Sequence, residues 1–211
     1  MSVRQERKDA AEHRKLILKT AQSLFAAYGV DQVSMHQIAK TAGIGQGTLY
    51  RRYTHKGDLC LDLIQDSCHT FIEQLSARLR EAADRPVMDR VAALVNGWVD
   101  FIEERAPWLY ALQSNNPCEE RRTVYYRSPI YLYMHETICG LLKQAVAGED
   151  GSSNGGNGSA PDADTAFTAH AVLSSFDPNF YFLIRREQNR TPDDFKRHLT
   201  EHLGRLFSNR T

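Results

Sequence analysis

Residues 34–56 carry side chains whose chemistry suits a DNA major groove and the phosphates beside it. Arg51 and Arg52 suit guanine O6 and N7 or a phosphate, and Gln46 suits adenine. The hydroxyls of Thr48 and Tyr50 suit phosphate oxygens. These types gather within seven residues, which predicts that one short helix presents them together on its outer face.

The elements that must position these side chains are two short helices joined by a tight turn. Ser34 followed by Gln37 is the capping box that opens a helix. Gly43 suits the left-handed backbone position at the end of that helix. Leu49 and Tyr53 are four residues apart, so they share the buried face of a second helix over about 45–53. The alternative is an ordinary helical hairpin with a charged outer face.

A third helix is predicted upstream of this pair. Apolar residues at 17, 21, 24, 25 and 28 recur with helical spacing, and Gly29 follows where a helix would end. Downstream, a long helix begins near Lys56. The pattern therefore predicts a three-helix head followed by a connecting helix.

With these residues in place, the chain resembles the tetracycline-repressor (TetR) family of bacterial transcriptional regulators. The resemblance covers roughly a quarter of the chain, and order, spacing and turn chemistry all agree. It rests on residues 17–25 with Tyr28 and Gly29, on Ile38 and Ala39, on Ala42, Gly43 and Ile44, and on residues 47–53.

The resemblance implies DNA-contact roles at the matching positions of this chain. His36 and Gln37 match backbone contacts at the start of the first motif helix, and Lys56 matches a phosphate-binding lysine. The recognition-helix positions are Gln46, Gly47, Thr48, Tyr50, Arg51 and Arg52. The chain departs from the family at Gly45, where a contacting side chain is missing. His55 and Gly57 replace the usual cap and acid, which weakens the start of the fourth helix.

The charge distribution also points to a nucleic-acid partner. The 211 residues have a formal net charge of zero, but residues 1–60 hold 10 Lys+Arg against 5 Asp+Glu, and residues 61–211 hold 16 against 21. A basic head on an acidic body is the asymmetry expected when one end meets phosphate. Residues 1–12 read as a flexible basic tail that tracks DNA, or else as an unremarkable solvated tail.

The remaining composition predicts a cytoplasmic protein with no membrane segment and no bound metal. The N-terminus lacks the apolar core of a secretory signal, and no apolar run reaches membrane length. The scattered His and Cys residues disfavour a transition-metal site. The four cysteines, Cys60, Cys68, Cys118 and Cys139, read as free thiols in a reducing compartment. A redox sensor is the alternative.

The rest of the chain also has a helical pattern, which predicts an all-α fold of about nine helices. The expected organisation is a helix-turn-helix domain at 13–56 and a helical domain at 57–208, with a flexible Gly-rich loop at 148–161. Pro107 is expected to open a short helix, and Pro129 to bend or interrupt a long one. Pro178 is expected to kink a helix that spans about 162–187.

The resemblance implies that residues 57–208 dimerise through the last two helices and enclose a ligand pocket. Two-fold symmetry independently favours a homodimer, because one recognition helix reads few bases. For the interface candidates and for the pocket candidates given next, the alternative is that they only form the core within one chain. Interface candidates are Phe167, Ala171, Ser174, Ser175, Leu199, Leu203, Leu206 and Phe207. Pocket candidates are the aromatics Trp98, Phe101, Trp108, Tyr110, Tyr126, Tyr133 and Phe176.

The predicted function is a ligand-responsive repressor that binds a palindromic operator as a homodimer, with a small apolar or aromatic effector and no cofactor. A DNA-binding adaptor of the same fold, without an effector, is the alternative. An enzyme is disfavoured because the chain has no nucleophile elbow, no paired carboxylates in a plausible cleft segment and no dinucleotide loop.

Overall fold

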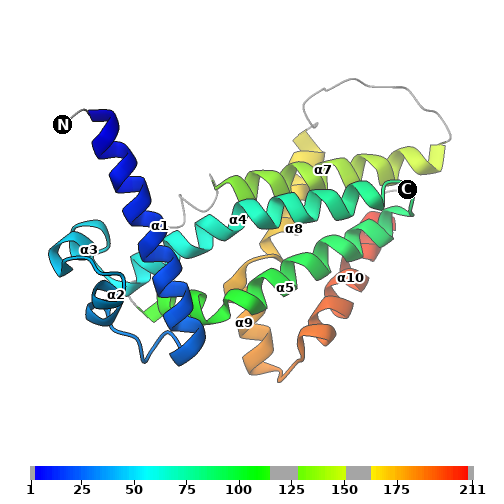
Figure 1. Ribbon diagram of the computed structural model, residues 1–211. Coiled ribbons are helices and arrows are strands. Elements are labelled where there is room, and N and C mark those ends of the chain that lie inside the picture. The colour runs from blue at the N-terminus through cyan, green and yellow to red at the C-terminus, as the bar shows by residue number, and fades with distance from the viewer. Residues whose placement is uncertain (1–2, 115–127, 151–162, 209–211) are drawn as a thin grey trace. The chain divides into compact units, whose positions relative to one another are not determined.

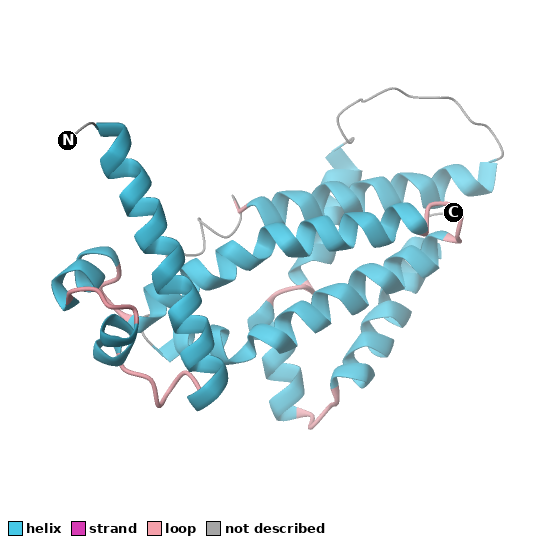
Figure 2. Ribbon diagram, viewed as in Figure 1, coloured by secondary structure: helices cyan, strands magenta, loops and turns pink. Residues whose placement is uncertain are grey.

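The computed structural model describes residues 3–114, 128–150 and 163–208. Over these residues it contains nine α-helices and no strand (Figure 2), which confirms the all-α expectation. The chain divides into two compact units. The first comprises Met1–Ser67 with Arg105–Cys118, and the second Cys68–Glu104 with Glu119–Thr211.

The first unit is built around three N-terminal helices, and Figure 1 shows α2 and α3 on the same side of α1. The start of α4 and the end of α5 complete this unit. Its core is apolar, with Ile17, Ile38 and Leu49 fully buried. The helices are α1 (Val3–Tyr28), α2 (Met35–Thr41), α3 (Gln46–Arg52), α4 (Lys56–Glu81) and α5 (Val87–Ser114).

The second unit contains the rest of α4 and α5 and four further helices. Trp98 of α5 packs edge-on against Phe176 and Tyr181, at ring-centroid distances of 5.3 and 5.8 Å. Lys196 pairs with Asp100 at 2.7 Å, which ties α10 to α5. The further helices are α7 (Pro129–Asp150), α8 (Ala163–Ser174), α9 (Pro178–Glu187) and α10 (Pro192–Ser208).

Helix α1 begins about ten residues earlier than the sequence pattern predicts. It runs from Val3, so most of the segment 1–12 that was expected to be a flexible tail is helical. The segment from Val3 to Tyr28 has neither Gly nor Pro. Residues of ordinary or good helix propensity therefore extend the helix beyond its apolar stripe.

Two prolines act differently from the expectation. Pro107 lies inside a continuous α5 instead of opening a separate helix. Buried residues on both sides of it, Ile102 and Ala111, hold the helix together across the missing hydrogen bond. Pro178 does not kink one long helix but starts α9, where Asp177 caps the backbone N–H of Asn179 at 2.6 Å.

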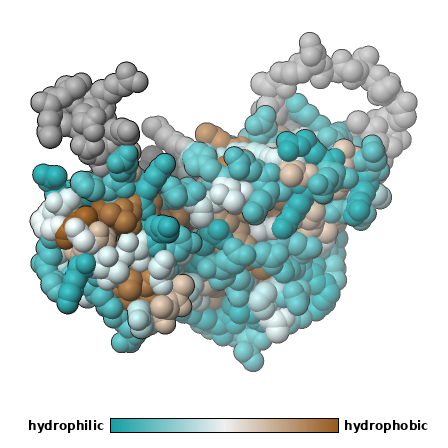
Figure 3. Space-filling view, in the orientation of Figure 1, coloured by the Kyte–Doolittle hydropathy of each residue, from teal (hydrophilic) through white to brown (hydrophobic). Residues whose placement is uncertain are grey.

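Two further expectations involve residues that the structure describes only in part. Helix α7 starts at Pro129, the proline that was expected to bend or interrupt a long helix, and residues 115–127 before it lie outside the described residues. Residues 148–150 of the predicted loop form the end of α7, and 151–161 lie outside the described residues. Among the described helices, none combines the length and apolar character needed to cross a membrane. The face in Figure 3 is mainly hydrophilic, with separate apolar patches.

Candidate nucleic-acid interface

The turn between α2 and α3 has the geometry of a helix-turn-helix. The Ser34 hydroxyl accepts the backbone N–H of Gln37 at 3.1 Å, which confirms the predicted cap. Gly43 has a φ of +67°, the left-handed conformation that the turn was expected to require. Ala39 and Leu49 are buried, and Ile44 packs against the same core. Local capping and apolar contacts thus determine the angle between the two helices.

Helix α3 turns its polar side chains outward. Tyr50 is 48% exposed, and Leu49 is its buried residue. Gly47 faces open space, because a Cβ built there meets no atom within 4 Å. Of the predicted contact residues, His36, Gln46, Gly47, Tyr50, Arg51 and Arg52 are exposed, and Gln37, Thr48 and Lys56 are half-buried.

A hydrogen bond joins α2 to α3 on this outer surface. The side-chain amide of Gln46 donates to Nδ1 of His36. Both residues are exposed, and Gln46 is the first residue of α3. The structure therefore brings together two residues that the sequence only placed ten positions apart.

The C-terminal end of α3 is tied to α1 and α4 through Asp62. Tyr53 is buried, and its hydroxyl donates to Asp62 Oδ2 at 2.5 Å. Arg14 of α1 donates to both oxygens of the same carboxylate, at 3.0 and 2.7 Å. A further bond of 3.0 Å runs from Arg14 to Asp66. Such a bidentate, charge-assisted pair fixes direction as well as distance.

The pKa shifts of Tyr53, Asp62 and Arg14 all favour a charged Asp62–Arg14 pair with a neutral Tyr53 hydroxyl. Burial raises the pKa of Tyr53 to about 12, and its hydrogen bond to Asp62 adds to the effect. Burial opposes ionisation of Asp62, but hydrogen bonds from Arg14 and Tyr53 outweigh it and lower its pKa. The hydrogen bond to Asp62 raises the pKa of Arg14, so the ion pair is favoured from both sides.

The network was not predicted from the sequence, which assigned no partner to Arg14. Arg14 and Asp62 are separated by 48 residues, and neither belongs to a recognisable motif. The helical spacing of Asp62 and Asp66, four residues apart on α4, was the one available signal. It indicates a shared face but no partner.

Two predicted DNA-contact cations already have internal partners. Lys56 Nζ donates to the backbone carbonyl of Val30 at 2.6 Å and lies 3.4 Å from that of Asp31. Arg52 lies over the ring of Tyr53, with 5.8 Å from Cζ to the centroid, and reaches the carbonyl of Ala10 at 3.4 Å. Lysine carries three donors, so the bonds of Lys56 leave one for another acceptor.

The start of α4 carries a cap that the sequence analysis did not expect. The carboxylate of Asp58 accepts the backbone N–H of His55 at 3.1 Å. Asp58 is the third residue of α4, so this bond is the return half of a capping box. It lies one position after Gly57, which replaces the usual acid. The departures at His55 and Gly57 are thus partly compensated.

The described members of the predicted ligand-pocket set lie in both units, and their role in ligand binding stays a prediction. Trp98, Phe101 and Phe176 are buried in aromatic contacts of the second unit. Tyr133 is half-buried and accepts a 2.8 Å hydrogen bond from Ser76. The others lie elsewhere: Trp108 and Tyr110 belong to the first unit, where Trp108 packs on the core, and Tyr126 lies outside the described residues.

The predicted interface residues divide into an exposed and a buried group. Phe167 is 74% and Leu206 is 41% exposed, although both are large and apolar. Ala171 and Ser174 are exposed, and Ser175 is half-buried. Leu199, Leu203 and Phe207 are buried within the chain, so the core alternative holds for these three in a single copy.

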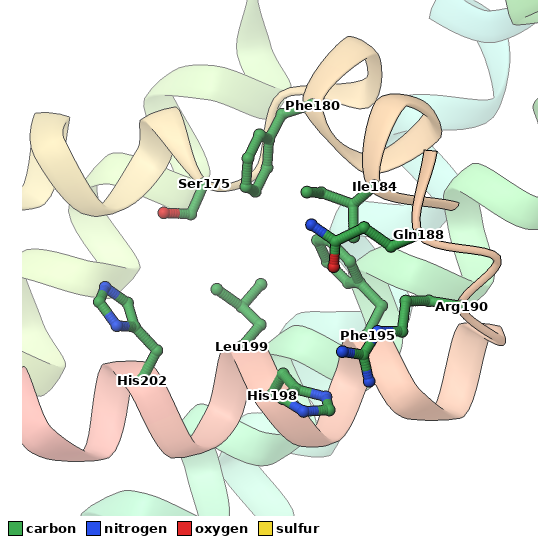
Figure 4. Close-up of a pocket in the computed structure, with 9 residues that line it drawn as sticks. All are labelled: Ser175, Phe180, Ile184, Gln188, Arg190, Phe195, His198, Leu199 and His202. Carbon is green, nitrogen blue, oxygen red and sulfur yellow. The ribbon is translucent and has the colours of Figure 1, made fainter. Parts of the chain in front are cut away.

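An open groove of about 310 Å³ lies beside the exposed group, between α9 and α10 (Figure 4). Phe180, Ile184, Phe195 and Leu199 give it an apolar lining, and His198 and His202 project from α10 toward it. Gln188, Arg190 and Ser175 complete the lining. None of the predicted pocket aromatics takes part.

None of the cysteines that the structure describes forms a disulfide. Cys60, Cys68 and Cys139 are buried, and Cys118 lies outside the described residues. Burial raises the pKa of the Cys60 thiol to about 12, which disfavours the reactive thiolate. Among the described residues, no group of three or more His, Cys, Asp or Glu side chains is arranged to hold a metal ion.

Together, the capped α2, the glycine turn and the outward-facing α3 define a helix-turn-helix protein. Residues 17–63 match the family described as bacterial regulatory proteins, tetR family. The match covers the helix-turn-helix region, so this part of the chain is similar to bacterial regulatory proteins of the tetR family.

A curated relative and two solved structures place the similarity along the chain. An HTH-type transcriptional regulator of Staphylococcus aureus (strain bovine RF122 / ET3-1) is 52% identical over 68 residues, which are 32% of this chain and 37% of the relative. The chain therefore matches little more than a third of that relative's length. Two solved structures are similar over almost the whole chain, but their sequence identity to it is at most 19%.

The first is the TetR-family transcriptional repressor FadR of Thermus thermophilus in complex with lauroyl-CoA. It has a TM-score of 0.64 at 19% identity, covering 94% of this chain and 95% of that one. The second is FadR of Bacillus subtilis in complex with stearoyl-CoA, with a TM-score of 0.58 at 17% identity and coverages of 93% and 99%. Both comparisons confirm the fold of an N-terminal helix-turn-helix followed by a helical domain.

Proposed function

We propose that this protein is a transcriptional regulator that binds a specific DNA sequence through α3. The observation that supports this proposal is that Gln46, Tyr50 and Arg51 are exposed and Thr48 is half-buried on a helix whose other face is buried at Leu49. Residues 13–56 are assigned to DNA binding, and residues 57–208 to dimerisation and ligand binding. A regulator of this kind acts in the bacterial cytoplasm, where the DNA is.

Selection of bound sequences from random duplex DNA tests this assignment. The expected result is an enriched palindrome whose half-sites lie one helical turn apart, about 34–36 Å. Enrichment of a single unrepeated site contradicts the dimer but leaves sequence-specific binding. Absence of any enriched sequence contradicts the proposed function.

The homodimer is proposed to form through the exposed apolar face of α8, α9 and α10. Phe167, Leu183 and Leu206 are large apolar side chains that one copy leaves at least 41% exposed. The groove between α9 and α10 continues this face (Figure 4). A second copy would cover these side chains and fill the groove.

Sedimentation velocity over a range of protein concentrations tests the dimer. Phe167→Glu and Leu206→Glu place charge on the proposed face and are expected to weaken self-association at least about tenfold. Leu16→Glu on α1, which is similarly exposed, is the matched control and should leave association unchanged. Equal association of all variants would place the interface elsewhere.

A small apolar effector is proposed to control DNA binding, by analogy with the FadR structures that hold acyl-CoA. The ligand must bind the two conformers with different affinity, since otherwise it shifts neither. Operator affinity measured with fatty acyl-CoAs of different lengths, and then with a broader metabolite library, tests the idea. Complete insensitivity to every compound that binds would contradict induction.

One observation favours the alternative, an adaptor without an effector. Trp98 and Phe176, two proposed pocket residues, pack against each other and against Tyr181 as a filled aromatic core. A ligand that used them would have to separate these rings. Saturation with acyl-CoA that leaves Trp fluorescence and operator affinity unchanged would support the adaptor.

A further inference from the structure

The hydrogen bond between His36 and Gln46 connects the two helices of the motif at the residue that starts α3. We propose that His36 is a specificity-determining residue that positions the amide of Gln46 for adenine and does not itself contact DNA. The inference rests on the proposed DNA-binding function and names how one base of each half-site is read.

The donor and acceptor roles follow from the chemistry of the two groups. The amide nitrogen of Gln46 is always a donor, so Nδ1 of His36 must accept. The neutral imidazole then carries its proton on Nε2. Gln46 uses one of its two N–H groups in this bond and keeps the other, together with its carbonyl oxygen.

The free N–H and the carbonyl oxygen form the pair that reads adenine in the major groove. The N–H donates to N7 and the oxygen accepts from the N6 amino group. An amide without a partner populates both orientations about its last bond, and ordering such a flexible side chain costs conformational entropy. Since His36 accepts only from the nitrogen, it selects one orientation before DNA arrives.

The surroundings of Gln46 leave the amide accessible to a base edge. The residues on either side are Gly45 and Gly47, and a Cβ at Gly47 would meet no atom within 4 Å. Helix-turn-helix proteins read bases mainly with the N-terminal residues of the recognition helix, and Gln46 occupies that place. At the other end of α3, Arg52 and Tyr53 are engaged with α1 and α4.

A direct phosphate contact by His36 is the competing role, and it has a different signature. Losing a phosphate contact weakens binding to every sequence alike, because the backbone carries no sequence information. Losing an orienting partner of Gln46 instead changes the preference at one base position. The two roles are therefore separated by a sequence profile and not by affinity alone.

The test compares binding-site selections for the wild type, His36→Ala, His36→Asn, Gln46→Ala and the double variant His36→Ala/Gln46→Ala. Asparagine retains an acceptor oxygen at the place of Nδ1, so it should restore the preference. His69→Ala, which removes another exposed imidazole, is the matched control. Thermal unfolding of each variant checks that it is folded.

The wild type should prefer adenine at one position of each half-site, by about 5- to 150-fold for a bidentate contact. In His36→Ala this preference should fall by about 2- to 12-fold, the equivalent of one net hydrogen bond. All other positions should keep their profile. His36→Asn should match the wild type, and the double variant should match Gln46→Ala.

Three results would overturn the inference. They are an unchanged profile in His36→Ala, a uniform loss of affinity across all sequences, and a wild-type profile without adenine at the position that Gln46→Ala relaxes. If the wild type itself enriches no sequence, it is the proposed function that fails. The two failures are thus distinguishable in one experiment.

Discussion

The hydroxyl of Tyr53, the residue that follows the recognition helix, donates a 2.5 Å hydrogen bond to Asp62 in the second turn of α4. The same carboxylate receives Arg14 of α1. One carboxylate therefore holds the end of α3 in relation to both long helices of the first unit. We expect these contacts to limit the movement of α3 relative to α1 and α4.

Tyr53→Phe should destabilise the protein by about 1–2 kcal/mol, since it removes a hydrogen bond to a charged, partly exposed acceptor. Urea unfolding followed by circular dichroism at one fixed protein concentration measures the loss. Tyr28→Phe is the control, because Tyr28 is 61% exposed. Equal stability of the two variants would show that the Tyr53 contact is energetically neutral.

Asp62→Asn should reduce stability most at neutral pH. The pKa of Asp62 is lowered in the folded state, so its contribution is present above the ordinary carboxylate pKa, about 4, and is lost as pH falls through the folded value. The difference in urea midpoint between wild type and variant should therefore shrink between about pH 5 and pH 3. Asp66→Asn, at a more exposed partner of Arg14, should show a smaller difference. A difference that stays constant with pH would contradict the ion pair.

Gly43→Ala and Gly47→Ala should have opposite effects on stability. Gly43 has a φ of +67°, so alanine there should cost about 1–2 kcal/mol through the left-handed backbone. Gly47 lies inside α3 with open space around it, so alanine should stabilise by about 0.5–1 kcal/mol. Thermal unfolding compares the two directly. The turn geometry would be in error if both substitutions had the same sign.

Lys56→Met should affect two measurements at once. Loss of the bonds to Val30 and Asp31 should lower stability by about 1 kcal/mol, because methionine keeps the stem but has no donor. If the third donor binds a phosphate as proposed, the slope of log affinity against log salt should fall by about 0.9. Lys143→Met, on α7 and outside the predicted DNA-contact residues, is the control for the salt slope. Lower stability with an unchanged slope would show that Lys56 stabilises the loop between α1 and α2 and does not bind a phosphate.

The sequence was sufficient for the local parts of the motif. The Ser34 cap, the left-handed Gly43 and the shared buried face of Leu49 and Tyr53 all depend on residues within four positions of one another. Backbone conformation and helical periodicity act over that range, so spacing alone predicts them. The start of α10 depends on the same local chemistry, because Thr191 and Asp194 cap each other.

Only the tertiary structure decided which distant groups meet. Arg14 and Asp62 are 48 residues apart, Lys56 and Val30 are 26 apart, and neither pair belongs to a motif that spacing reveals. Helix packing also kept α5 continuous through Pro107, against its local preference, because buried residues flank the proline. Contacts of this kind depend on how whole helices pack. The sequence therefore determined which side chains are available for DNA, and the tertiary structure decided which of them are held by partners within the chain.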